Sequence, residues 1–158
     1  MKKIVIFLCL ILLCTGCGSE SVEKKEFDKE VAKEKIADLT FSGSDFKFDE
    51  NENVNNVDVL NVYGVEIDRL NDYLFYISSD VVDPSMYLIA SCDEDNKSVV
   101  KYQIDELFNK YYSAYNNYYP KEAKMINDRL EKEYEGYLIY VVSYDNDKVY
   151  QAIEESFK

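Results

Sequence analysis

The sequence predicts an α+β domain built as a two-layer sandwich, with a long central helix and a C-terminal helix packed on a small, mainly antiparallel sheet. Three observations support this class. Short runs rich in aromatic and β-branched residues, at 73–78, 86–91 and 137–144, have the composition of strands. Apolar residues spaced by three or four over 100–118 indicate a long helix. Strands grouped on either side of such a helix are typical of α+β folds.

The first residues have the composition of an export signal. Lys2 and Lys3 precede the unbroken apolar run 4–13, which is about half of the roughly 20 residues that a helix needs to cross a bilayer. The following Cys14-Thr15-Gly16-Cys17 resembles the bacterial lipobox, whose last cysteine is linked to diacylglycerol and becomes the mature N-terminus. We therefore expect Cys17 to anchor the chain to the outer face of the cell membrane, where more than one acyl chain makes attachment durable.

This interpretation divides the chain into a signal peptide at 1–16, a tether at 17–26 that starts with the lipidated cysteine, and a single domain at 27–158. Cys14 stands where the lipobox usually has leucine, but Leu13 is too bulky to precede a cut before Cys14. The alternatives are an ordinary secretory signal that is cleaved nearby, or an anchor that is not cleaved.

Composition excludes several classes of function. The net charge is −13, and removal of the leader with its lysines makes the chain more acidic still. Such a surface repels nucleic acid and anionic lipid head groups, although acidity alone is mostly a solubility feature. With no histidine, Ser-His and Cys-His nucleophile pairs and His-ligated metals are excluded. We expect no cofactor, metal or nucleic acid. Cys92 follows an apolar run, which favours a buried or half-buried bystander over a reactive thiol.

The first half of the domain alternates helical and extended patterns. Phe27 to Leu39 has an approximate apolar face, and Val57 to Tyr63 predicts a short helix or turn that stops at Gly64. The runs 73–78 and 86–91 are predicted strands, separated by a loop that contains Asp83-Pro84. Both runs carry apolar residues on both faces, so we expect both faces to be covered.

The second half begins with the long helix, which opens at Asp93 to Asn96. Its apolar stripe consists of Val100, Ile104, Leu107, Phe108, Tyr111, Tyr115 and Tyr118. Pro120 ends it and begins a shorter helix that extends to Arg129. Residues 131–136 lead into the run 137–144, predicted to be the central strand, and Asp145 to Asp147 caps the last helix with Val149, Ile153 and Phe157 on one face.

This arrangement resembles the bacterial lipoproteins grouped as domain of unknown function 4358. The resemblance rests on the step Tyr63-Gly64-Val65, on the aromatic helix end Tyr118 to Glu122, and on Gly136-Tyr137 leading to Val142-Ser143-Tyr144-Asp145. It implies a single-domain lipoprotein from a Gram-positive source. The family carries no assigned activity, so the resemblance implies no catalytic residue.

Two kinds of candidate site can be named. The acidic clusters 93–96 and 145–147 invite a calcium hypothesis, but neither has the glycine and glutamate that an EF-hand loop requires, and helix capping explains both. Tyr112 and Tyr119 lie seven apart, outside the apolar stripe, and are candidates for a partner surface.

The sequence therefore favours a membrane-anchored, extracytoplasmic domain without catalytic residues, which binds an envelope protein or glycan or takes part in envelope assembly. The alternative is an envelope hydrolase that uses acidic residues, with Glu131 or Asp145 as candidates. Two converging carboxylates in a pocket, one with a raised pKa, would favour the hydrolase. A flat aromatic patch would favour binding.

The anchor can be tested by intact-mass analysis of protein extracted from membranes. We expect a chain that begins at Cys17 and carries a diacylglyceryl group, because the residues before it have the lipobox pattern. An unmodified Cys17, or a chain that starts elsewhere, would contradict the prediction.

Overall fold

A four-stranded antiparallel sheet forms the centre of the computed structural model, which describes residues 25–49 and 57–158. The strand order is β1 (Asp72–Ile77), β2 (Met86–Ser91), β4 (Tyr137–Val142) and β3 (Leu130–Tyr134). The helices are α1 (Lys29–Ala37), α2 (Val57–Tyr63), α3 (Glu94–Asn116), α4 (Pro120–Asn127) and α5 (Asn146–Glu154), with a 3-10 turn at Ile67–Arg69. The signal peptide, Cys17 and most of the tether lie outside the described residues.

The strands form where the sequence places β-branched and aromatic residues, and the turns set their register. Glu135 and Gly136 connect β3 to β4, and both have positive φ angles, of 50° and 85°. A two-residue turn of this kind matches the twist of a hairpin, which fixes Tyr134 opposite Tyr137. On the other side, β2 pairs with both β1 and β4, so the two most hydrophobic runs lie in the middle of the sheet.

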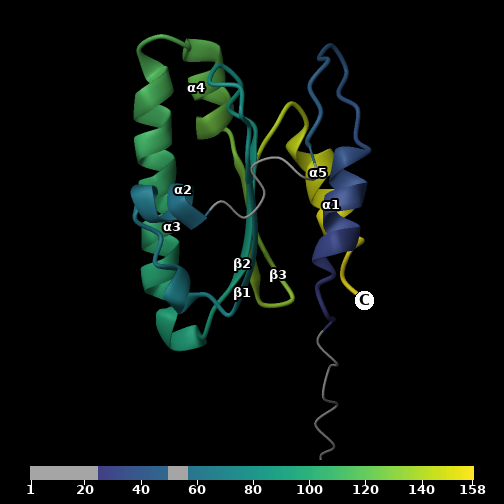
Figure 1. Ribbon diagram of the computed structural model, residues 1–158, viewed down its shortest axis with the longest axis vertical. Coiled ribbons are helices and arrows are strands. Elements are labelled where there is room, and N and C mark those ends of the chain that lie inside the picture. The colour runs from purple at the N-terminus through teal and green to yellow at the C-terminus, as the bar shows by residue number, and fades with distance from the viewer. Residues whose placement is uncertain (1–24, 50–56) are drawn as a thin grey trace, which may run out of the picture.

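Helices cover both faces of this sheet (Figure 1). Because side chains alternate along a strand, Leu88 and Ile89 of β2 enter different cores, and both are fully buried. Leu88 packs in the core beneath α2, α3 and α4, and Ile89 packs in the core beneath α1 and α5. The sheet is thus the middle layer of the domain.

The predicted α+β class, the antiparallel sheet, the long helix and the C-terminal helix are all confirmed. The number of layers differs from the prediction, because α3 and α5 pack on opposite faces of the sheet and produce three layers. The spacing of apolar residues shows that a helix has one apolar face. It does not show against which face of the sheet that helix packs. The expectation that both strand faces are covered is confirmed by the two cores.

The helix boundaries follow the predicted signals with one exception. Gly64 has a φ of +91° directly after α2, and Pro120 occupies the first turn of α4. Tyr111 and Tyr115 are buried in the stripe of α3, but Tyr118 is 79% exposed, so its predicted packing role is wrong. The reason is that α3 ends at Asn116, and the helical spacing no longer applies beyond it.

The two ends of the described domain meet at one end of the sheet. Glu26 and Lys158 exchange backbone hydrogen bonds of 2.8 and 2.9 Å, and Phe27 packs its ring against Phe157 and Tyr137. In Figure 1, the start of the coloured ribbon and the C-terminus both lie toward the lower end, which we call the tether end. No helix within 25–49 and 57–158 is long and apolar enough to cross a bilayer.

Burial of both sheet faces predicts that neighbouring residues of β2 are equally sensitive to truncation. We expect Leu88→Ala and Ile89→Ala each to lower the free energy of unfolding by about 2–5 kcal/mol, because each leaves a cavity in a separate core. Val62→Ala is the control, since Val62 is 80% exposed. Denaturant unfolding measures all three, and a small effect for either β2 variant would contradict the three-layer arrangement.

Candidate functional site

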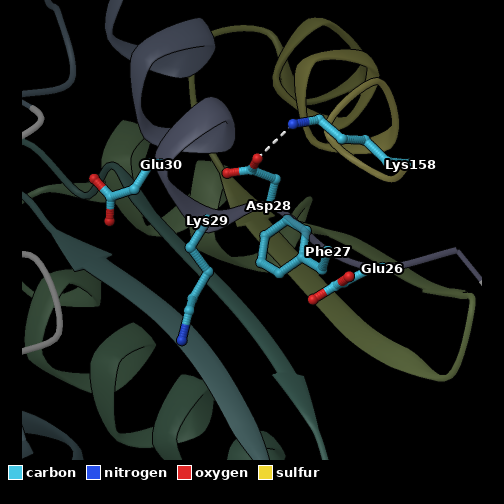
Figure 2. A pocket seen from close by; sticks show the side chains of 6 residues that line it. All are labelled: Glu26, Phe27, Asp28, Lys29, Glu30 and Lys158. Atoms are coloured by element: carbon cyan, nitrogen blue, oxygen red, sulfur yellow. Dashed lines mark hydrogen bonds and ion pairs between the residues drawn. The ribbon is translucent and has the colours of Figure 1, made fainter.

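The tether end holds a hollow of about 400 Å³ that is lined mostly by charged side chains, several of them in ion pairs (Figure 2). Asp28 accepts a hydrogen bond from the Lys158 ammonium at 2.6 Å and from the backbone N–H of Val31, which lowers the pKa of its carboxyl. The Lys29 ammonium contacts the Asp72 carboxylate at 2.5 Å. These pairs join α1 to the sheet and to the C-terminus, so the hollow is explained by closure of the domain.

The flank between α3 and β3 carries Glu131, one of the two residues of the hydrolase hypothesis. Its carboxylate lies 2.5 Å from the Arg129 guanidinium, which also stacks over the ring of Phe108. Two residues further along β3, the Glu133 carboxylate accepts a hydrogen bond from the Lys97 ammonium. This hydrogen bond lowers the pKa of the Glu133 carboxyl. Paired charges on an outer strand discourage pairing with other chains, which accounts for this ladder.

Asp145, the other candidate acid, caps α5 by accepting a hydrogen bond from the backbone N–H of Lys148 at 3.1 Å. The capping prediction is therefore confirmed here. Asp93 occupies the corresponding position before α3, but its carboxylate accepts from the Asn71 side chain instead. Within the described part of the chain, no three acidic or cysteine side chains are grouped closely enough to hold a metal ion.

The carboxyl groups with shifted pKa values do not resemble a general acid. Partners lower the pKa of every one of them, and a catalytic acid at neutral pH needs a raised pKa. These groups are Asp28, Glu66, Asp128 and Glu133.

Cys92 lies in a small hollow beside Asp93, Glu94 and Lys97, and it is half-buried as predicted. Burial raises the pKa of its thiol, and the neighbouring carboxylates oppose the positive charge of Lys97. A raised pKa leaves less thiolate, which is the reactive form. The site around Cys92 therefore has the electrostatics of an unreactive thiol.

The opposite end of the molecule is organised by Asp83, a buried residue in the loop between β1 and β2. One carboxylate oxygen accepts from the backbone N–H of Ser85 at 2.7 Å, and the other accepts from the Tyr144 hydroxyl at 2.8 Å. The backbone carbonyl of Asp83 accepts from the Tyr115 hydroxyl at 3.3 Å. A single residue thus joins the 78–85 loop to α3 and to the segment between β4 and α5.

The tyrosines around Asp83 stay protonated, so their hydroxyl groups donate hydrogen bonds. Burial and the Asp83 carboxylate raise the pKa of Tyr144 to about 12. Burial also raises the pKa of Tyr115, whose ring packs against Tyr111 at a centroid distance of 5.0 Å. The Tyr144 ring rests on Phe46 and Phe41, which extends the ordered network to the 41–48 loop.

Several exposed aromatic and aliphatic side chains lie at this end, which we call the distal surface, while others lie on α2 and along α3. Its members are Val81 (79% exposed), Val82 (41%), Tyr118 (79%), Tyr119 (37%) and Tyr144 (45%). In Figure 1 the 78–85 loop and the turn between α3 and α4 lie at the upper end, opposite the tether end. Scattered exposed apolar residues are ordinary, but these come from three segments connected through Asp83.

Of the predicted partner residues, only Tyr119 belongs to the distal surface. Its ring packs at 5.8 Å from that of Tyr115, and its carbonyl accepts the first hydrogen bond of α4. Tyr112 is equally exposed, but its hydroxyl donates to Asn116 further along α3. Sequence reasoning did not identify Asp83 or Tyr144, because an Asp-Pro pair between two strands is typical of any loop.

Comparisons of the chain with protein-family models, with curated proteins and with solved structures found no match. The resemblance to domain of unknown function 4358 therefore stays a prediction.

The role of Asp83 can be tested against its exposed neighbour in the same loop. We expect Asp83→Ala to destabilise the domain by about 1.5–3 kcal/mol, because it removes hydrogen bonds to a buried charged group. Asp80→Ala is the matched control, since Asp80 is exposed and its carboxylate accepts a hydrogen bond from the Val82 N–H. Its cost should be about 1 kcal/mol or less. Equal urea midpoints for the two variants would contradict the assigned role of Asp83.

Proposed function

We propose that this protein is a lipid-anchored extracytoplasmic binding domain, held at the membrane through diacylglyceryl-Cys17 and contacting an envelope partner with its distal surface. The lipobox-like Cys14 to Cys17 supports the anchor. The candidate acids Glu131 and Asp145 are engaged in an ion pair and a helix cap, so no observation favours the hydrolase alternative.

One observation carries the proposal: the described start of the domain and the distal surface lie at opposite ends of the domain. Residues 25 and 26 are fixed beside the C-terminus at the tether end, and the distal surface is at the far end. A tether over 17–26 spans at most on the order of 30 Å when extended. An anchored domain of this shape directs its distal surface away from the bilayer, and its negative charge keeps it from lying on anionic lipids.

The distal surface also has the chemistry of a binding surface. Tyrosine offers a large apolar ring with a polar tip, and it loses little conformational entropy when a partner covers it. The hydrogen bonds of Asp83 hold the 78–85 loop and Tyr144 in place before any partner arrives. Such pre-organisation lowers the entropy cost of association.

Site-specific photocrosslinking in cells that express the full-length chain tests this proposal. A photoreactive phenylalanine analogue placed at Tyr118 should yield a discrete crosslinked product, because Tyr118 projects from the distal surface. The matched control is the same analogue at Tyr102, which is 65% exposed on α3.

The two positions have similar exposure, so unspecific collisions should label both alike. A product at 118 that is absent at 102 supports the proposal. Equal products at both positions, or none at 118, would contradict it.

A further inference from the structure

Acidic side chains surround the distal surface. The segments that form this end, 41–49, 78–85, 117–122 and 143–147, contain few basic residues. Their acids are Asp45, Asp49, Asp80, Asp83, Glu122, Asp145 and Asp147, and their bases are Lys47 and Lys121. A third base, Lys148, follows directly and reaches this end, where its ammonium donates to the Thr40 carbonyl and lies 6.0 Å from the Phe41 ring. Acids still outnumber bases in this region. Exposed aromatic rings are therefore set in a region of locally negative charge, rather than in the mixed charge of the β3 flank.

Two of these carboxylates, Asp80 and Glu122, belong to the segments that carry the exposed side chains of the distal surface. Asp80 is exposed, and its negative charge adds to that of Asp83 in raising the pKa of Tyr115 above the value that burial gives it. Glu122, in the first turn of α4, acts in the same direction on Tyr144. Asp80 directly precedes the exposed Val81, and Glu122 follows Tyr119 by three residues. Within residues 25–49 and 57–158, neither acid forms an ion pair with a basic side chain.

This combination selects among partners. A second copy of the acidic chain and an anionic lipid surface are both repelled, and the surface faces away from the bilayer in the anchored form. An uncharged glycan would stack on the tyrosines, but the carboxylates would add little to its binding affinity. The affinity of an arginine or lysine side chain is raised by the tyrosines and by the carboxylates. A cation is attracted to the face of an aromatic ring, and it forms strong hydrogen bonds to carboxylates.

We propose that the distal surface binds a basic polypeptide segment of an envelope protein, with an arginine or lysine placed over Tyr118 and paired with Asp80 or Glu122. This inference rests on the proposed function and adds the chemistry of the partner. The apolar stem of the same side chain would pack on Val81 and Val82, since long basic side chains bury their methylene groups and keep the charge at the surface.

The test uses the full chain in nanodiscs of phosphatidylcholine, which do not themselves attract a basic peptide. Fluorescence anisotropy measures the affinity of a labelled Arg-Ser repeat peptide, with a Glu-Ser repeat as the negative probe. We expect the basic probe alone to bind, with an affinity that decreases as salt is added.

Two double variants that each remove two negative charges, together with Tyr118→Ala, show where on the domain the basic probe binds. Asp80→Asn with Glu122→Gln should weaken binding of the basic probe by about tenfold, and Tyr118→Ala should weaken it similarly. Asp80→Asn keeps an oxygen that can accept from the Val82 N–H, so the loop is retained. The control, Asp68→Asn with Asp95→Asn, removes the same charge from exposed positions near the start of α3 and should change affinity by less than about twofold.

Equal weakening by both charge variants would show only a general attraction to an acidic protein and would overturn this inference. Binding of an uncharged N-acetylglucosamine oligomer that depends on Tyr118 but not on Asp80 would also overturn it, while leaving a binding role for the distal surface intact. If neither the Arg-Ser peptide nor the N-acetylglucosamine oligomer binds, and no crosslinked product forms at Tyr118, the inference and the proposed function are both contradicted.

Discussion

Burial of the sheet on both faces is the constraint on which the rest of this structure depends. The central strands β2 and β4 place every inward and outward side chain in one of two cores, so neither face is available to a ligand. The β3 edge is occupied by ion pairs that Glu131 and Glu133 make with basic neighbours. Of the two ends of the sheet, the chain uses one for its own closure through Glu26 and Lys158, and the other carries the distal surface.

Asp83 gives the remaining end its order. A buried carboxylate is costly unless it is hydrogen-bonded, and here the cost is offset by donors from the Ser85 backbone and the Tyr144 side chain. The same residue connects to α3 through the Tyr115 hydroxyl. The distal loops are thereby fixed to the rigid layers on both sides of the sheet. This explains how exposed side chains such as Val81 and Tyr118 can keep a defined arrangement without being buried themselves.

Local signals in the sequence were enough to predict β1, β2 and β4, because their residues are β-branched and aromatic. Most helix boundaries were also predicted, because Gly64 and Pro120 act on their own neighbourhood. The edge strand β3 is polar and was predicted only as a segment leading into β4. Features that depend on distant contacts could not be predicted. The placement of α3 and α5 on opposite faces requires both helices and the sheet at once. Tyr118 continues the spacing of Tyr111 and Tyr115 but follows the end of α3, and the importance of Asp83 appears only when Tyr144, 61 residues later, is brought beside it. The Cys17 anchor lies outside the described residues and stays a prediction.

The central claim is that the distal surface is covered by a partner in the cell while the sides of the domain stay open. Hydroxyl-radical footprinting measures this directly, because it reports the solvent exposure of individual tyrosines by mass spectrometry. The comparison is between native membranes and the same chain purified in detergent. We predict that Tyr118 is protected in membranes and exposed after purification, while Tyr102 is modified equally in both. Equal modification of Tyr118 in the two samples would contradict the account.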